Sequence, residues 1–258
     1  MTDEAADAAV RGTFRRRIRL IRGERQVVAG IEDDFHAFKV VVTHDGQRVT
    51  DVAAEAVRYP LDTCPGAIEP LQALHGATLS ADCRAIGGLA DARMNCTHLF
   101  DLAGLAIAHA CRDQVHRQYD VAIPDAHRNR TQASLFVDGS ERLRLEMLAD
   151  EIEAPAPFAG QNIGRGFSRW VLANVADMEL REALLVLHRG WFVSRGRQHV
   201  EQIADLRGVW TAIGAGACYS HQPERKQTAV RLQNTIRDFT SADSALVQFL
   251  EGRSTPQQ

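Results

Sequence analysis

The stretch from Phe14 to Tyr59 alternates apolar and polar residues with a period of two, which is typical of strands that bury one face. In one run Phe38, Val40 and Val42 fall on the same face. Between two such runs lies His44-Asp45-Gly46-Gln47, and Asp-Gly supplies the positive φ angles of a tight hairpin. Because tight hairpins join antiparallel neighbours, the pattern predicts a meander of about four strands.

A second set of alternating runs follows in the middle of the chain. The runs are Tyr119 to Ile123, Thr131 to Val137 and Arg142 to Leu148, and Asp138-Gly139-Ser140 separates the last two. A turn with Asp-Gly between two such runs is typical of a β-hairpin. The pattern therefore predicts a second group of antiparallel strands.

Three segments have the properties of helices. From Asn95 to His116 apolar residues recur at intervals of three and four, which is the spacing of one helical face. Asp177 to Arg195 has a similar stripe, and its first residue is a suitable N-cap. A third helix is expected to begin at about Thr63, with a proline in its first turn, and to end near Gly76.

Strands and helices in separate groups indicate an α+β fold, with antiparallel sheets packed against amphipathic helices. We expect one domain over residues 12–251, since a chain of 258 residues with 45% apolar residues can form one packed core. The termini, residues 1–11 and 252–258, are expected to be flexible. Cys218-Tyr219-Ser220-His221 is predicted to lie on a loop or an edge strand.

Composition excludes several classes of function. The 30 basic and 33 acidic residues give a formal net charge of −3, so we expect no nucleic-acid partner. No apolar run approaches the roughly 20 residues that a membrane-spanning helix needs.

Met1 to Val10 lacks the features of a secretory signal, and the five cysteines show no repeated spacing, as expected for free thiols in the cytoplasm. Gly164-Arg165-Gly166 is too short for a phosphate loop and no redox-cofactor motif is present, so no cofactor is expected.

The first cluster of ionisable residues is Glu32-Asp33-Asp34-Phe35-His36. Residues two apart on a strand share a face, so Asp34 and His36 are predicted to be neighbours. The carboxylate would then fix the tautomer of the imidazole and raise its basicity, as a general base requires. The alternative is a charged hairpin tip without a catalytic role.

The second cluster runs from Asn95 to Asp101. On a helix His98 and Asp101 are three residues apart and face the same way, so the carboxylate is predicted to orient the ring. His109 returns to within about 20° of the direction of His98. The alternative is that Cys96 is a small buried apolar residue and that His98 is an ordinary hydrogen-bonded residue at the helix start.

The third cluster is Cys218 to Pro223, where Tyr219 offers a hydroxyl that can donate to a developing oxyanion or act as a base. Arg58 and Tyr59 precede the helix expected at Thr63, and they are candidates for binding an anionic or phenolic oxygen. The alternatives are a half-buried Tyr219 whose hydroxyl contacts water and an ordinary surface ion pair at Arg58.

The cysteines raise two further chemistries. Cys64, Cys96, His98, Cys218 and His221 have the atom types of zinc ligands. However, Cys96 and His98 diverge by about 200° on a helix, and no Cys-x-x-Cys pair is present. Alternatively, Cys96 at a helix N-terminus beside His98 is a nucleophile.

A series of short motifs follows in one order along the chain. They are Glu32 to Val42, Arg58-Tyr59-Pro60, Cys64-Pro65-Gly66-Ala67, Leu71 to Gly76, Asn95-Cys96-Thr97-His98-Leu99, Asp101-Leu102 and Cys218 to Pro223. Each motif is weak alone, but in combination they resemble the family called domain of unknown function 2889, over about Phe14 to Phe239. Asn95 stands where a glycine is usual in that family, so the local backbone is expected to differ there.

The resemblance implies a role in bacterial catabolism of lignin-derived aromatics, where related proteins look like lyases that release a hydroxymethyl group as formaldehyde without a bound cofactor. Such a lyase needs a base for the primary alcohol and an acid or cation for the phenolate or ether oxygen. We expect these catalytic roles to fall to His36 with Asp34, to His98, to Arg58 and to Tyr219. The expected substrate contacts are Tyr59, Cys96, Thr97, Asp101, Cys218 and His221.

This hypothesis requires imidazole and carboxylate groups to converge on one hollow large enough for a phenol, between the sheet and the helix that begins at Asn95. The expected partner is a small aromatic substrate, and the apolar helices also allow a homodimer. The alternatives are a zinc- or thiol-dependent protein that binds a small ligand, and a hydrolase that cleaves an ester or thioester through Cys96.

Overall fold

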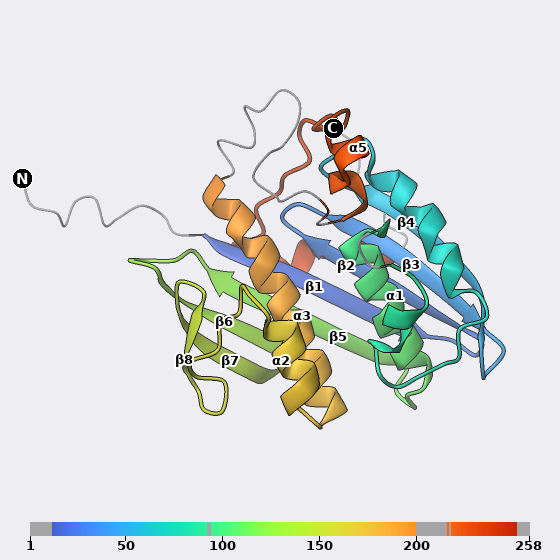
Figure 1. Cartoon of the computed structure of the whole chain (residues 1–258), viewed down its shortest axis with the longest axis horizontal. Helices are drawn as coiled ribbons and strands as arrows, with labels where there is room; N and C mark the ends of the chain where they lie inside the picture. The colour runs from blue at the N-terminus through green and yellow to red at the C-terminus, as the bar shows by residue number, and fades with distance from the viewer. Residues whose placement is uncertain (1–11, 92–93, 200–215, 217, 252–258) are drawn as a thin grey trace, which may run out of the picture.

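The computed structural model describes residues 12–91, 94–199, 216 and 218–251. These residues form one eight-stranded antiparallel sheet with helices packed against it, which confirms the α+β fold class (Figure 1). The strand order is β4-β3-β2-β1-β5-β6-β7-β8. The strands are β1 (Thr13–Arg22), β2 (Gln26–Asp33), β3 (Ala37–His44), β4 (Val49–Arg58), β5 (His116–Pro124), β6 (Arg130–Val137), β7 (Ser140–Leu148) and β8 (Glu151–Ala154).

The sheet consists of two four-stranded meanders that meet at its centre, where β1 pairs with β5. In this central pair Ile18 lies opposite Tyr119. Each meander is followed in sequence by helical segments. They are η2 (Cys64–Leu74), η3 (Ala85–Gly88) and α1 (Thr97–Ala110) after the first meander, and α2 (Phe167–Asn174), α3 (Met178–Ser194) and η5 (Arg195–His199) after the second. The chain then continues through η6 (Tyr219–His221), α5 (Pro223–Lys226), η7 (Asp243–Ala245) and η8 (Gln248–Glu251).

The period-two pattern of β1 assigns its side chains to the two faces of the sheet. Phe14, Ile18 and Leu20 are buried on one face, and helices α1 and α3 cover that side of the sheet (Figure 1). On the other face Arg17 donates to the carbonyl of Asp243 in the C-terminal segment. The same segment packs closely over β2, because a Cβ at Gly30 would lie 2.5 Å from a methyl of Leu250. Helices therefore cover one face of the sheet, and the C-terminal segment that includes Asp243 and Leu250 crosses the opposite face.

The helices lie where apolar periodicity predicted them. Helix α1 packs on β2 and β3 through a stripe of buried residues, and α3 packs on β5 and β6. The predicted cap of α3 is confirmed, because the Asp177 carboxylate accepts from the N–H of Leu180 at 2.9 Å. The helix expected at Thr63 is present, but it is a 3-10 helix with Pro70 in its interior. A proline has no N–H to donate, which disfavours a regular α-helix there.

One prediction about a segment boundary was wrong. Helix α1 ends at Ala110, and His116 is the first residue of β5 because it pairs with Ile21 of the central strand. The segment from Cys218 to His221, predicted to lie on a loop or an edge strand, contains a short 3-10 turn, which agrees with the loop. Strand β8 and helix α2 were not anticipated. Residues 1–11 and 252–258, expected to be flexible, lie outside the described residues, and the single domain over residues 12–251 stays a prediction.

Candidate functional site

A cavity of about 540 Å³ opens on the helix-covered side of the sheet. The turn between β2 and β3, the start of α1, the end of α3 and the segment around η6 supply its walls. The residues that line it are Phe35, His36, Phe38, Pro60, Leu61, Cys64, Cys96, Thr97, His98, Arg189, Phe192, Val193, Arg195, Gly196, Cys218, Tyr219, Ser220, His221 and Arg231. Its size lies within the range of pockets that hold small organic ligands.

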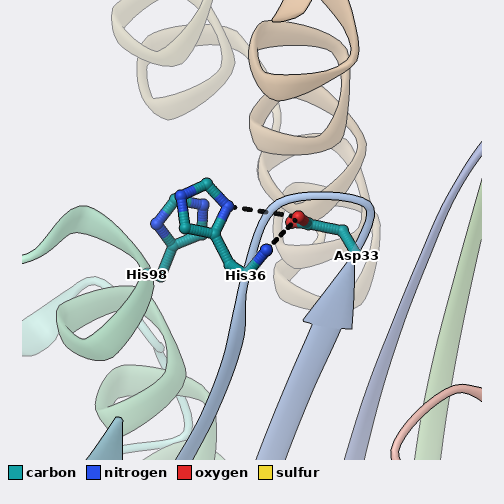
Figure 2. Close-up of side chains that lie close together, drawn as sticks. All are labelled: Asp33, His36 and His98. Atoms are coloured by element: carbon teal, nitrogen blue, oxygen red, sulfur yellow. Dashed lines mark hydrogen bonds and ion pairs between the residues drawn. The ribbon is translucent and has the colours of Figure 1, made fainter. Parts of the chain in front are cut away.

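The β2–β3 turn is organised by the carboxylate of Asp33, the last residue of β2. One oxygen, Oδ1, accepts from the N–H groups of Phe35 at 2.8 Å and His36 at 2.9 Å. The same oxygen lies 3.1 Å from Nδ1 of the His36 ring, and Figure 2 shows both contacts between Asp33 and His36. Because the carboxylate fixes both the backbone and the ring, His36 is held in one orientation at the cavity wall.

Arg16 neutralises Asp33 from the neighbouring strand. Its Nη2 and Nε donate to Oδ2 of Asp33 at 2.5 and 3.0 Å, and both side chains are almost fully buried. Burial alone would raise the pKa of the Asp33 carboxyl, but Arg16 and then His36 hold that pKa well below its usual value. Asp33 is therefore ionised throughout the physiological range and available to accept a proton-bearing nitrogen from His36.

The ring of His98 packs against the ring of His36 at an interplanar angle of 31°. Their centroids are 4.0 Å apart, although the two residues come from the first turn of α1 and from the β2–β3 turn (Figure 2). Nε2 of His98 lies 3.1 Å from Nη2 of Arg16. A guanidinium only donates, so this nitrogen must accept, and the ring proton of neutral His98 belongs on Nδ1, which lies 3.8 Å from Sγ of Cys96. Burial, the neighbouring His36 and Arg16 together lower the pKa of His98 well below its usual value.

His36 has the protonation state of a base at neutral pH. Burial lowers its pKa, and the neighbouring Asp33 opposes part of that shift. Since Nδ1 donates to the carboxylate, Nε2 is the nitrogen that carries the lone pair of the neutral ring. The pair of Asp33 and His36 is thus an oriented imidazole that can take up a proton and be stabilised as a cation by the carboxylate.

The prediction that Asp34 orients His36 was wrong. Strand β2 ends at Asp33, so residues 34–36 form a turn and the alternation of a strand no longer applies to them. The Asp34 carboxylate forms a buried ion pair with Arg197 at 2.5 Å instead. Its immediate neighbour Asp33 has the role that the sequence reading gave to Asp34.

The prediction that Asp101 orients His98 was also wrong. Asp101 pairs with Arg189 of α3 at 2.6 Å and with Arg84 at 3.6 Å. Both residues are on α1, but an arginine on the neighbouring helix attracts the carboxylate, while the ring of His98 packs on the β2–β3 turn. His109, which was expected to follow the same line, is buried with Nε2 3.3 Å from the carbonyl of Val115.

Arg58 and Tyr59 are not among the residues that line the cavity. The Arg58 guanidinium donates to the carbonyls of Asp33 at 2.5 Å and His36 at 3.3 Å, so it supports the turn from outside the cavity. Tyr59 packs against the small apolar cluster that contains Cys64. Both residues position the wall of the cavity and do not contact its interior.

The remaining predicted residues, apart from Asp101, also line the cavity. Cys96, Thr97, Cys218, Tyr219 and His221 all line it, although the last three lie far from the others in sequence. Sγ of Cys218 is 3.2 Å from Nδ1 of His221. The guanidinium of Arg225 stacks on the ring of Tyr219 at 3.8 Å from its centroid.

The thiols of this wall are protonated at neutral pH. Burial raises the pKa of Cys64 to about 11, and it also raises the pKa values of Cys96 and Cys218. Among the described residues, the only set of three or more His, Cys, Asp or Glu ligand atoms within 4.8 Å of one another is Asp33, His36 and His98. The cysteines therefore share the cavity without forming a compact set of metal ligands within that part of the chain.

Asp33 and Arg16 were missed by sequence reasoning, although one signal pointed to Arg16. It occupies a position of β1 between Phe14 and Ile18, on the face that is otherwise apolar. A charged residue at a core-facing strand position is rarely buried unless it is paired. Phe35, Phe38, Phe192, Arg189, Arg195 and Arg231, which also line the cavity, had no such signal.

Comparisons with known proteins relate the first part of the chain to a family without an assigned function. No curated protein matches the chain. No helix among the described residues is long and apolar enough to cross a membrane. The sequence model of one family, described as protein of unknown function (DUF2889), matches residues 5–112, a range that contains Arg16, Asp33, His36 and His98. Residues 5–112, less than half of the chain, are therefore similar to the DUF2889 family of proteins of unknown function.

Proposed function

We propose that the protein is a carbon–carbon lyase that acts on a lignin-derived aromatic dimer and releases a hydroxymethyl group as formaldehyde. The observation that carries the proposal is the pair of Asp33 and His36 on the wall of a cavity of about 540 Å³. The side chains of Phe35, Phe38 and Phe192 also line this cavity. Aromatic side chains provide flat apolar surfaces on which a phenolic ring can stack.

The proposed reaction begins with a proton transfer to His36. Nε2 takes the proton of the primary alcohol, and Asp33 stabilises the imidazolium that forms. The bond between the carbinol carbon and its neighbour then breaks, and the carbinol becomes formaldehyde. The released electron pair forms a carbon–carbon double bond and expels the oxygen substituent on the adjacent carbon. A proton from an acid in the cavity completes the departure of that oxygen.

Tyr219 is assigned as the acid, because it lines the cavity from the wall formed by η6. A phenol donates to an oxygen that gains negative charge, which favours departure of the ether or hydroxyl group. His98 is assigned a positioning role, since its neutral ring packs against His36 and is itself held by Arg16. Every proton in this scheme moves between side chains and substrate, so the proposal requires no cofactor.

The test is an assay for formaldehyde after incubation of the purified protein with phenolic hydroxymethyl dimers. We expect release by the wild type and a fall of kcat by about 10²–10⁴-fold in His36→Ala, which is the usual contribution of a general base. His116→Ala is the matched control, because this histidine is exposed at the start of β5 and does not line the cavity. Circular dichroism establishes that both variants are folded. No release from any such dimer, or equal rates in the two variants, contradicts the proposal.

A second candidate is a metal-dependent protein that binds a small ligand. It is favoured by the set of Asp33, His36 and His98, whose ligand atoms lie within 4.8 Å of one another. Two histidines and a carboxylate are a common ligand set for iron and zinc. However, Arg16 already pairs with Asp33 and lies 3.1 Å from His98, so a metal ion would stand beside a buried positive charge. Elemental analysis decides between the two, because near-stoichiometric metal that is lost in His98→Ala supports this candidate.

We also expect the protein to act in the cytoplasm on a small molecule, without nucleic acid, and to form a homodimer. The mass in solution from light scattering tests the dimer.

A further inference from the structure

We infer that the neutral ring of His98 donates a hydrogen bond from Nδ1 to the same substrate hydroxyl that His36 deprotonates. This role rests on the proposed function in taking the region beside His36 as the place where the primary alcohol binds. It goes further because it gives His98 a direct contact with the substrate, in addition to its packing on His36, and specifies which chemical groups fit between the two rings.

The fold sets the tautomer of His98. Its Nε2 accepts from the guanidinium of Arg16 at 3.1 Å, so the ring proton lies on Nδ1. Arg16 is itself held by two donations to the carboxylate of Asp33, and both of these side chains are almost fully buried. Because an arginine keeps its proton, Nδ1 of His98 is a hydrogen-bond donor before any substrate arrives.

This donor lacks a strong acceptor among the described residues. His98 is only 7% exposed, and within that part of the chain the hydrogen-bond contact of its Nδ1 is Sγ of Cys96, at 3.8 Å. A thiol sulfur is a weak acceptor, and a buried N–H group without a good acceptor costs free energy. His98 and Cys96 both line the cavity, so an oxygen of a bound molecule can replace the sulfur as the acceptor.

The two imidazole rings present complementary groups to one region. Their centroids are 4.0 Å apart. One nitrogen of each ring is engaged by the buried ion pair, since Nδ1 of His36 contacts Asp33 and Nε2 of His98 contacts Arg16. The other nitrogen of each ring lies on the side away from Asp33 (Figure 2). A lone pair on His36 and an N–H group on His98 are therefore available side by side.

A hydroxyl group matches this pair. Its proton is donated to Nε2 of His36, and one of its lone pairs accepts from Nδ1 of His98. When His36 removes the proton, the oxygen gains negative charge and the hydrogen bond from His98 becomes stronger. The same hydrogen bond holds this oxygen as it becomes the carbonyl oxygen of formaldehyde, and the proton of His98 stays on its ring. An ether or a carboxylate has no proton for His36, so the pair selects an alcohol.

Two substitutions at position 98 separate the roles of the two ring nitrogens. The amide nitrogen of an asparagine can occupy the place of Nδ1, and the amide oxygen of a glutamine can occupy the place of Nε2. His98→Asn thus keeps a donor for the substrate, while His98→Gln keeps an acceptor for Arg16 and loses that donor. We expect kcat for formaldehyde release to fall about 10²-fold or more in His98→Gln, the usual effect of losing one such donor. In His98→Asn it should stay within about tenfold of the wild type.

Each of these variants is the control for the other, because both lose the packing of an aromatic ring on His36. Circular dichroism establishes that they are folded. Equal losses in the two variants, or a larger loss in His98→Asn, overturn the contact between His98 and the substrate and leave the ring with a structural role alone.

Nuclear magnetic resonance of the wild type labelled with [15N]histidine tests the same contact without turnover or a variant protein that must fold. We expect Nδ1 of His98 to carry its proton at pH 7. That proton should shift when 4-hydroxycinnamyl alcohol binds, and not when 4-propenylphenol binds, which has a methyl in place of the hydroxymethyl group. A proton on Nε2, or the same response to both phenols, overturns the assignment.

The outcome for the proposed function is separate. Formaldehyde release that falls equally in both variants leaves the lyase standing without this contact. A shift that is specific to the alcohol, without release from any dimer, leaves a hydroxyl-binding site without the lyase.

Discussion

The two meanders of the sheet are built alike, yet only one of them carries the candidate catalytic pair. Strands β1–β4 and α1 form one half, and β5–β8 and α3 form the other, with β1 and β5 paired at the centre (Figure 1). In each half the helix packs on strands of its own meander. The halves differ most in the turn between their second and third strands.

The turn of the second half, between β6 and β7, consists of Asp138 and Gly139. Both have positive φ angles, 51° and 83°, which is the conformation of a two-residue hairpin turn. The turn of the first half, between β2 and β3, has three residues and no positive φ angle. Two of its N–H groups, those of Phe35 and His36, donate to the buried Asp33 carboxylate instead. A turn that relies on a buried charge provides an oriented carboxylate next to a histidine, whereas a turn that relies on backbone conformation provides none.

The largest expected effect is on stability and separates the two turns directly. In Asp33→Ala the guanidinium of Arg16 stays buried without its counter-charge, and two backbone N–H groups lose their acceptor. We expect a loss of about 3–5 kcal/mol in the free energy of unfolding. In Asp138→Ala a side chain that is 41% exposed loses the hydrogen bond from the N–H of Gln118 and the ion pair with Arg117, and the expected loss is about 1–2 kcal/mol.

Urea unfolding of the three proteins measures both changes, provided that the slope against urea concentration is unchanged. Losses of similar size at the two positions contradict the view that a buried charge organises only the first turn.

The next effect is on pH dependence and compares a histidine from each half. Burial lowers the pKa of His36, and burial also lowers the pKa of His188 on α3, to about 4. Of these two histidines, only His36 lines the cavity of the proposed reaction. Because the base must be neutral, we expect kcat/KM for formaldehyde release to have the midpoint of its acid limb below about pH 6.5, the ordinary pKa of histidine. Below the pKa of His36 it should fall about tenfold per pH unit.

His188→Asn should leave the midpoint of this acid limb unchanged, and a midpoint above pH 6.5 is incompatible with a buried neutral base. Unfolding must be excluded at each pH. The folded-state pKa of His188 lies below the unfolded value of about 6.5, so the unfolded chain binds protons first and stability falls as the pH drops from 6.5 towards 4. Circular dichroism over the same pH range separates the two effects.

Much of the fold was predictable because the relevant interactions are local. The Asp-Gly sequences predicted hairpins, and Gly46 and Gly139 have the positive φ angles those turns require. Asp177 caps α3 through a hydrogen bond to a residue three positions later. Such features depend on a few consecutive residues and are visible in the sequence itself.

The candidate site was only half predictable because its ion pairs join distant segments. His36 and His98 were identified from their neighbours in sequence, and the structure brings their rings together. The choice between Asp33 and Asp34 depends on Arg16 and Arg197, which lie on β1 and η5 and reach the turn only in the folded protein. A periodic pattern within one segment does not indicate which of two neighbouring carboxylates will pair with an arginine from another segment.

The smallest expected effect concerns the thiol at the start of α1. Cys96 lies at the N-cap of this helix and beside His98, the arrangement that suggested a nucleophile for ester or thioester hydrolysis. Burial raises the pKa of Cys96, so the thiolate that such a reaction needs is scarce at neutral pH. Nδ1 of His98 also carries the ring proton, because Nε2 accepts from Arg16, and a nitrogen that bears a proton cannot remove one from the thiol.

We therefore expect Cys96→Ala to keep formaldehyde release within about threefold of the wild type, since it removes one buried sulfur and no acid–base group. A loss of kcat comparable to that in His36→Ala would contradict this expectation. It would indicate that Cys96, and not the pair of Asp33 and His36, is the reacting group.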